Sequence, residues 1–209
     1  MKLVKYEHAC FTLEEDGRLL VVDPGGLSTD FIAPDNVAGI IITHEHFDHF
    51  DTEQLAGIID KNPDALIIAH EAVTSNIETF STRPVMAGES LEVGSFRLSF
   101  HGGEHALIHS SIPKIANLGV MINDLLYYPG DSFTLPGVPV DTLALPVAAP
   151  WMKASEAIDF LNVVNPRFVF PTHDAILSDG GKMVVDRVIG GAAEKAGAEY
   201  KRLSEPVEI

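Results

Sequence analysis

The chain has 209 residues, of which 46% are hydrophobic and 21% charged, and its 30 acidic against 14 basic side chains give a formal net charge of −16. This length predicts a single domain over residues 1–209 that buries its core without disulfides, and the lone Cys10 has no partner in the chain. Because neither a cluster of Lys and Arg, nor an apolar run of about 18 residues, nor a secretory leader stands out, we expect a cytoplasmic protein with no membrane span and no nucleic-acid partner.

The N-terminal part of the chain predicts strands that lead into a histidine-rich segment. Short apolar runs bounded by turn residues occur at 2–8, 9–15 and 18–23. The dipeptide Asp16-Gly17 between two of these runs predicts a β-hairpin. After a loop from Pro24 to Asn36, the β-branched run at 39–44 is typical of a strand buried on both faces.

The remaining elements alternate between strands and helices. A helix is predicted over Thr52–Lys61, where Asp51 and Gln54 have the spacing of a capping box and Leu55 and Ile58 lie on one apolar face. Further strands are expected at 65–70, 91–94, 95–100, 117–122, 125–131, 142–146, 168–173 and, as the last edge strand, 199–203. Further helices are expected at 70–80, Ser155–Val164 and 180–197. This mixture predicts a layered α/β fold with sheets inside and helices outside.

The segment His44-Glu45-His46-Phe47-Asp48-His49 places four metal-ligand side chains within six residues, directly after a buried strand. In an extended chain, residues two apart point to one side, so His44 and His46 can bind one cation while Asp48 and His49 turn toward a neighbouring position. Burying so many polar side chains at the end of one strand costs free energy, and a bound cation would offset that cost. The motif therefore predicts a site that can serve two metal ions.

Three distant residues are candidates for completing the ligand shells. His105, Asp131 and His173 each follow an apolar strand, which is where functional groups of layered sheet proteins commonly lie. Six residues of chain cannot supply about four donors to each of two ions, so further ligands must come from elsewhere. Taken singly, a histidine after a strand is more often a surface or hydrogen-bonded side chain than a ligand, and Asp131 alone could form an Asx turn.

These motifs, in this order and in these strand contexts, resemble those of the metallo-β-lactamase superfamily from about Val21 to Asp174. The resemblance implies an αββα sandwich of two mixed β-sheets with a dinuclear site at one edge. It implies that His44, His46 and His105 hold one ion, that Asp48, His49 and His173 hold the other, and that Asp131 bridges them. The expected cofactors are two divalent cations, zinc first, with manganese or iron as alternatives. The sequences HEHFDHFD and PTHD are most similar to those of the branch that contains the ascorbate-phosphate lactonases and the phospholipase-D-like acylethanolamine hydrolases.

A metal site of this kind indicates a metal-dependent hydrolase. We expect it to use a metal-activated hydroxide to attack a small ester, lactone or phosphodiester. Asp48 is the candidate for orienting or deprotonating the water, and His109 is the candidate proton donor to the leaving group, with a solvated His109 as the alternative. A mononuclear iron oxidoreductase similar to the sulfur dioxygenases is the competing hypothesis.

Two further features were open to more than one interpretation. Trp151-Met152-Lys153 could bind an anionic small-molecule substrate, or Trp151 could pack while Lys153 is solvated. Asp23 could be a hydrogen-bond partner of a ligand histidine, or simply a turn residue.

Overall fold

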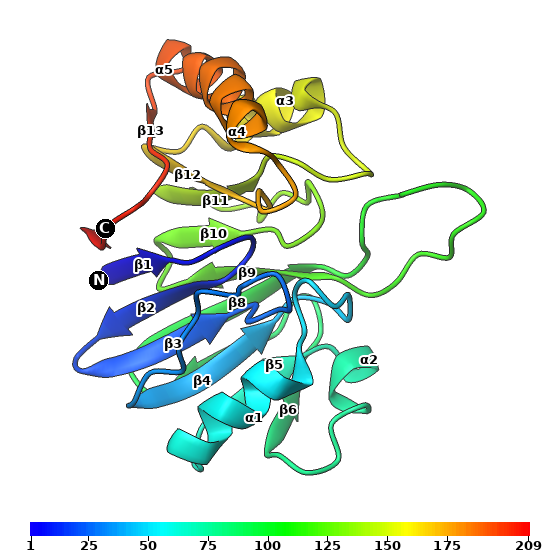
Figure 1. The fold of residues 1–209 in the computed structure, drawn as a ribbon, viewed down its shortest axis with the longest axis vertical. Helices are drawn as coiled ribbons and strands as arrows, with labels where there is room; N and C mark the ends of the chain where they lie inside the picture. The colour runs from blue at the N-terminus through cyan, green and yellow to red at the C-terminus, as the bar shows by residue number, and fades with distance from the viewer.

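The computed structural model describes residues 1–209 as two seven-stranded β-sheets that face each other between outer layers of helices (Figure 1). In strand order, the first sheet consists of β14 (Val207–Glu208), β1 (Lys2–Lys5), β2 (Phe11–Glu15), β3 (Arg18–Val22), β4 (Val37–Ile42), β5 (Leu66–Ala69) and β6 (Thr82–Pro84). The second sheet consists of β13 (Glu199–Tyr200), β12 (Phe168–Thr172), β11 (Thr142–Pro146), β10 (Leu126–Tyr128), β9 (Leu118–Ile122), β8 (Phe96–Gly102) and β7 (Ser90–Val93).

Each sheet combines an antiparallel half with a parallel half. In the first sheet β14, β1, β2 and β3 are antiparallel neighbours, and the pairs from β3 to β6 are parallel. In the second sheet the pairs from β7 to β10 are antiparallel and those from β10 to β13 are parallel. The sheets are therefore mixed, and β4, whose six residues are all buried between parallel neighbours, shows why its sequence is continuously apolar.

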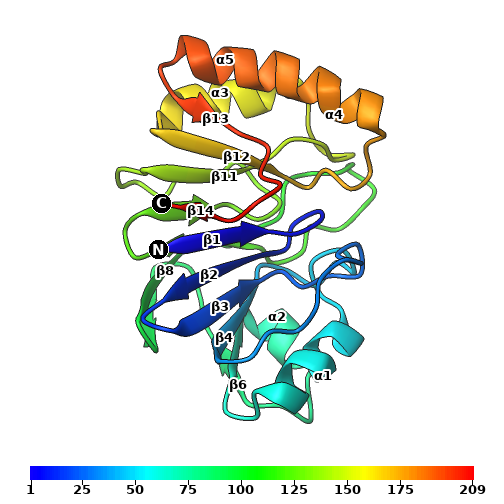
Figure 2. The same cartoon turned by 60° about the vertical axis from the view of Figure 1, so that its left-hand side comes forward.

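The helices form the two outer layers. They are α1 (Thr52–Lys61), α2 (Glu71–Thr74), α3 (Ala154–Val164), α4 (Asp179–Val185) and α5 (Gly191–Lys195), and a π-helical segment, η1 (Asp186–Gly190), joins the last two. Figure 2 shows α1 and α2 beside the parallel half of the first sheet, and α3, α4 and α5 over the parallel half of the second. None of these helices combines the length and hydropathy needed to cross a membrane.

The hydrophobic core follows the same four layers. The largest cluster, of 23 buried residues, contains side chains of both sheets, such as Phe11 and Phe170, and fills the space between them. A second cluster joins the second sheet to α3 and α5, and a third joins the first sheet to Leu55 and Ile58 of α1. The predicted αββα sandwich is therefore confirmed.

The predicted hairpin turn and the predicted bounds of α1 are confirmed, whereas one detail of the α1 cap is not. Asp16 and Gly17 both have positive φ, which suits the tight turn between β2 and β3. Helix α1 has the predicted bounds, and Asp51 caps it by accepting hydrogen bonds from the backbone N–H groups of Glu53 and Gln54. The expected capping box is wrong, because the Gln54 amide donates to the Ser28 carbonyl instead of to the cap.

The largest error concerns the helix predicted at 70–80. Only Glu71–Thr74 is helical, because the Asn76 side-chain amide donates to the Ala72 carbonyl while the Asn76 backbone N–H donates to the carbonyl of Val73 instead. The chain then forms β6, which was not predicted. The strand at 199–203 is also shorter than expected and is not the last, since β14 follows it on the other sheet.

Candidate metal centre

The seven predicted ligands come together at one edge of the sandwich, where several strands end. The segment that contains His44, His46, Asp48 and His49 follows β4, whereas His105, Asp131 and His173 follow β8, β10 and β12. An eighth residue, His8, joins them from the turn between β1 and β2. Side chains of both sheets therefore converge on one site.

These side chains form two groups that could each hold a metal ion. The first ligand group contains His44, His46, His105 and Asp131, and the second ligand group contains His8, Asp48, His49 and His173. Within each group the ligand atoms lie within 4.8 Å of one another. Asp131 also reaches the second group, because its Oδ1 lies 3.3 Å from His49 Nε2 and its Oδ2 lies 3.1 Å from His173 Nε2.

Hydrogen bonds at the outer nitrogen fix the orientation of three imidazoles. His49 Nδ1 donates to Asp23 Oδ2 at 2.7 Å, His105 Nδ1 donates to the carbonyl of Ala106 at 2.6 Å, and His173 Nδ1 donates to the carbonyl of Ala148 at 2.5 Å. In the neutral form of these imidazoles the single proton lies on Nδ1, so each Nε2 then presents a lone pair to the centre of the site. Metal-binding histidines are commonly oriented in this way.

Four of the inward-facing atoms have no hydrogen-bond partner within the protein. His49 Nε2, His105 Nε2, His173 Nε2 and Asp131 Oδ1 are all buried without a hydrogen bond. Buried polar atoms are rarely unsatisfied, because burial without a partner costs on the order of 1–3 kcal/mol for each group. Imidazole nitrogens and a carboxylate oxygen converging in this state fit a divalent cation, which would satisfy them together.

Asp23 connects the outer sides of the two groups. Besides accepting from His49, its carboxylate accepts hydrogen bonds from the backbone N–H and the hydroxyl of Thr43, at 2.8 and 2.7 Å. The Thr43 oxygen in turn lies 3.0 Å from His44 Nδ1, and it accepts from this nitrogen because its own proton is directed to Asp23. One buried carboxylate thus orients a ligand of each group.

Hydrogen bonds with two neighbouring side chains hold Asp131 in place. Its backbone N–H donates to Asn117 Oδ1 at 2.9 Å, and the indole of Trp151 donates to Asp131 Oδ2 at 2.8 Å. The preceding Gly130 has a φ of +61°, and a Cβ there would lie 2.4 Å from the Asn117 oxygen. Only glycine therefore allows this close approach behind the carboxylate.

Charges within the site oppose the effect of burial. Burial alone would raise the pKa of Asp131 and lower that of His49, but their mutual attraction, with Asp23 acting on His49, lowers the first and raises the second. The nearby carboxylates of Asp131 and Asp48 likewise outweigh burial and raise the pKa of His173 to about 9. Burial and neighbouring imidazoles lower the pKa of His44 and His46.

The other residues singled out in the sequence, His109, Trp151 and Lys153, lie outside both ligand groups. His109 belongs to neither ligand group: it is exposed in the segment between β8 and β9, which projects from the body in Figure 1, and its Nδ1 accepts from the hydroxyl and backbone N–H of Ser111. Its role as proton donor stays a prediction. The Trp151 ring packs on Phe133 and its N–H is used by Asp131, while Lys153 is exposed at the start of α3.

His8 was not predicted from the sequence. It stands at the end of the first apolar run of the chain, which is the same strand-end context that singled out His105 and His173. That context was a usable signal. The structure adds that the His8 side chain is completely buried and lies 2.9 Å from Asp48 Oδ2.

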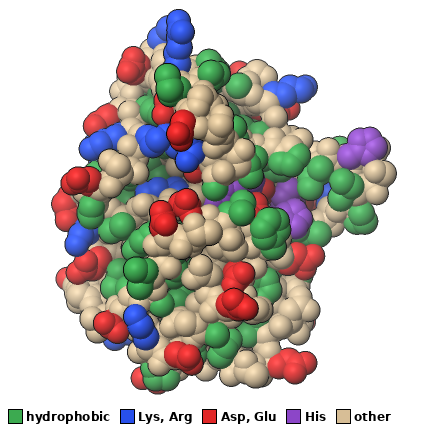
Figure 3. Space-filling view, viewed as in Figure 1, with side chains coloured by type: hydrophobic (Ala, Val, Ile, Leu, Met, Phe, Trp, Pro, Cys, Tyr) green, Lys and Arg blue, Asp and Glu red, His purple; other side chains and the backbone are tan.

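A cavity of about 900 Å³ opens beside the first ligand group. Its lining includes His105, Leu107, Phe133 and Trp151, together with Lys114, which is paired with Glu104 at 2.8 Å. Figure 3 shows histidine side chains at the surface near the middle of the molecule, with hydrophobic side chains beside them. The volume suits a small molecule.

Comparisons with known proteins assign this architecture to a family. The family model described as the β-lactamase superfamily domain matches residues 2–173. The chain is 37% identical over 183 residues to protein Rv0786c of Mycobacterium tuberculosis, covering 85% of this chain and 86% of the relative. It is 27% identical over 195 residues to a UPF0173 metal-dependent hydrolase of Carboxydothermus hydrogenoformans, covering 83% and 84%.

A solved structure supports the same assignment of the fold. The crystal structure of a putative metal-dependent hydrolase from Parabacteroides distasonis matches with a TM-score of 0.78 at 20% identity, covering 96% of this chain and 91% of that one. The chain belongs to the metallo-β-lactamase superfamily, as its motifs predicted. It is an enzyme of the hydrolase class of that superfamily, with candidate metal-binding clusters of histidine and aspartate.

Proposed function

We propose that this protein is a metal-dependent hydrolase that loads two divalent cations, zinc first among them, and cleaves a small ester, lactone or phosphodiester. The observation that carries the proposal is the set of buried, unpartnered atoms of His49, His105, His173 and Asp131. Bound divalent cations would lower the pKa of a water toward neutrality and so supply a nucleophile.

The residues of the chain divide the remaining work. Asp131 faces both ligand groups and fixes their relative position, because Asn117 and Trp151 hold its backbone and its Oδ2. Asp48 is half-buried at the edge of the second group, and its contacts with His8 and His173 lower its pKa against the effect of burial. An ionised carboxylate at this position can orient a nucleophilic water and accept its proton.

The cavity supports the substrate class. It is large enough for a small molecule, and its lining joins polar groups near His105 to the apolar surfaces of Leu107, Phe133 and Trp151. A carbonyl or phosphoryl oxygen directed at the ligand groups would leave the rest of the substrate over these side chains. A net charge of −16 disfavours a polynucleotide, whereas a small anionic group held at the metal centre is compatible with it.

The first test is the metal content of protein purified without chelators, followed by lactone and phosphodiester substrates with each metal restored. We expect close to two divalent ions per chain and hydrolysis that His46→Ala and Asp131→Ala abolish, while His101→Ala, outside both groups, retains it. Unchanged rates in the first two variants would rule the proposal out. One iron per chain with oxygen uptake on a persulfide would favour the oxidoreductase alternative.

A further inference from the structure

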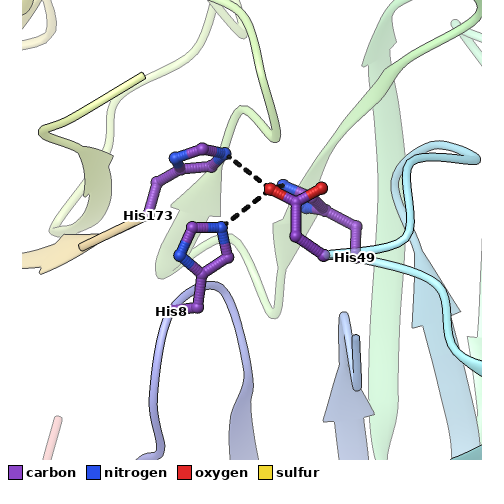
Figure 4. Close-up of side chains that lie close together, drawn as sticks. His8, His49 and His173 are labelled. Atoms are coloured by element: carbon purple, nitrogen blue, oxygen red, sulfur yellow. Dashed lines mark hydrogen bonds and ion pairs between the residues drawn. The ribbon is translucent and has the colours of Figure 1, made fainter. Parts of the chain in front are cut away.

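His8 differs from the other histidines of the site in what its outer nitrogen does. It lies in the turn between β1 and β2, with a completely buried side chain and a φ of +54°. A positive φ is uncommon for a residue other than glycine, and such strain often marks a functional position. Figure 4 shows His8 beside His173, with both imidazoles directed at the carboxylate next to His49.

The hydrogen bonds of His8 determine its tautomer. Its Nδ1 accepts the backbone N–H of Ala175 at 3.3 Å, so the proton of the neutral ring lies on Nε2. That Nε2 donates to Asp48 Oδ2 at 2.9 Å. His49, His105 and His173 have the opposite arrangement, in which Nδ1 donates and Nε2 is free. A protonated Nε2 has no lone pair for a cation, although its position falls among the possible ligands.

The backbone of His8 holds a second ligand. Its carbonyl oxygen accepts the backbone N–H of His173 at 3.0 Å and the ammonium group of Lys5 at 2.7 Å. The imidazoles of His8 and His173 also pack against each other, with ring centroids 4.1 Å apart. The turn of the first sheet is thereby joined to the residue that follows β12 of the second sheet.

We propose that His8 is a positioning residue of the second ligand group: its Nε2–H directs the Asp48 carboxylate, and its carbonyl places His173, without His8 itself binding the metal. The inference rests on the proposed binding of a cation by Asp48, His49 and His173. This role accounts for a histidine in a buried turn with positive φ. Its side chain orients Asp48, which follows a strand of the first sheet, and its carbonyl places His173, which follows a strand of the second. Hydrogen-bond partners of metal ligands commonly change affinity about 10- to 100-fold when removed.

Two variants separate positioning from ligation. His8→Gln places an amide N–H₂ near the position of Nε2 and keeps a donor for Asp48, whereas His8→Asn tolerates positive φ but is too short to reach. The measurements are the affinity for each zinc ion by chelator competition and the visible spectrum of the cobalt-substituted protein. We expect His8→Asn to weaken one ion by about 10- to 100-fold, and His8→Gln to retain most of the affinity and an unchanged cobalt spectrum.

The opposite results would overturn the proposal. If both variants lost one ion to the same extent and the cobalt spectrum changed, His8 would be a metal ligand. If His8→Asn bound both ions with full affinity, His8 would have no positioning role. His101→Asn is the matched control, since His101 lies outside both groups and contacts Ser99 through its side chain. Thermal unfolding of each variant shows whether it has folded.

A measurement without metal keeps the inference independent of catalysis. Nitrogen-15 NMR of the metal-free protein distinguishes the two ring nitrogens, and we expect the proton of His8 on Nε2. A proton on Nδ1 would contradict the proposal even if His8→Asn did not fold. If the wild-type protein bound metals but hydrolysed none of the substrates, the proposed function would fail while the role of His8 would still be decided by affinity.

Discussion

The two ligand groups share Asp131 but differ in exposure and in charge. In the first group, His46 is only half-buried and borders solvent, and burial lowers the pKa of its imidazole and of His44. In the second group, His49 and His173 are buried, and the carboxylates around them raise their pKa values despite burial. The lowered pKa values of His44 and His46 favour metal binding at neutral pH, whereas protons on His49 and His173 compete with a cation in the second group.

The largest effect is expected from removing the charge that the two groups share. Asp131→Asn keeps the shape of the side chain but removes the anion between His49, His105 and His173. We expect hydrolysis to fall by on the order of a thousandfold, at the upper limit for the loss of one electrostatic contact. Metal analysis of the same variant should show loss from both groups. Loss from one group alone would show that Asp131 belongs to that group and does not bridge.

Metal binding by the two groups should depend differently on pH. Because the pKa of His173 is about 9 in the metal-free protein, a proton competes with the cation below that pH. The affinity of the second group should therefore fall about tenfold per pH unit for each protonated ligand between pH 9 and pH 7. The affinity of the first group should change little over this range, since the pKa values of His44 and His46 lie below the ordinary value for histidine.

Chelator competition at several pH values checks this expectation, and proton release on metal addition in weak buffer provides a second measure. Two ions with the same pH dependence would show that protonation does not distinguish the groups. In the metal-free Asp131→Asn variant, the pKa of His49 and of His173 should fall, because the Asp131 carboxylate is a cause of their raised values.

A smaller effect is expected from the indole that contacts Asp131. Trp151→Phe removes the N–H donor to Asp131 Oδ2 while a ring remains to pack on Phe133. We expect about a tenfold loss of metal affinity, at the low end for a hydrogen-bond partner of a ligand, because Asn117 still holds the backbone of Asp131. Phe133→Leu is the matched control for packing alone. Equal effects of both variants would assign Trp151 to the wall of the cavity and not to Asp131.

The sequence predicted those parts of the site that depend on local spacing and on strand ends. The cluster from His44 to His49 is contiguous, and the resemblance supplied the order of His105, Asp131 and His173. The contacts of His8, Trp151 and Asp23 depend instead on how segments far apart in sequence meet. No periodicity within the chain shows that the turn after β1 touches the end of β12, so the residues that orient the ligands were missed or left open.

In the fold, too, the elements set by local sequence were predicted and those set by long-range pairing were not. Strong local signals, such as the Asp51 cap and the continuously apolar β4, gave the correct elements. The helix expected at 70–80 was wrong because the side chain of Asn76 takes the Ala72 carbonyl and the helix ends after Thr74. The short β6 and β14 are strands only through pairing with their neighbours. Elements fixed by tertiary pairing could not be derived from propensity.

The smallest effect is expected at His109, the predicted proton donor. His109→Gln should change the rate of hydrolysis by less than about twofold, because the side chain is exposed, belongs to neither ligand group and interacts with Ser111, whereas a general acid typically contributes about 10²- to 10⁴-fold. Rates with a good and a poor leaving group make the test specific, since loss of a proton donor slows the poor leaving group selectively. A hundredfold selective loss would assign the proton transfer to His109 and would show that the segment between β8 and β9 approaches the first ligand group during turnover.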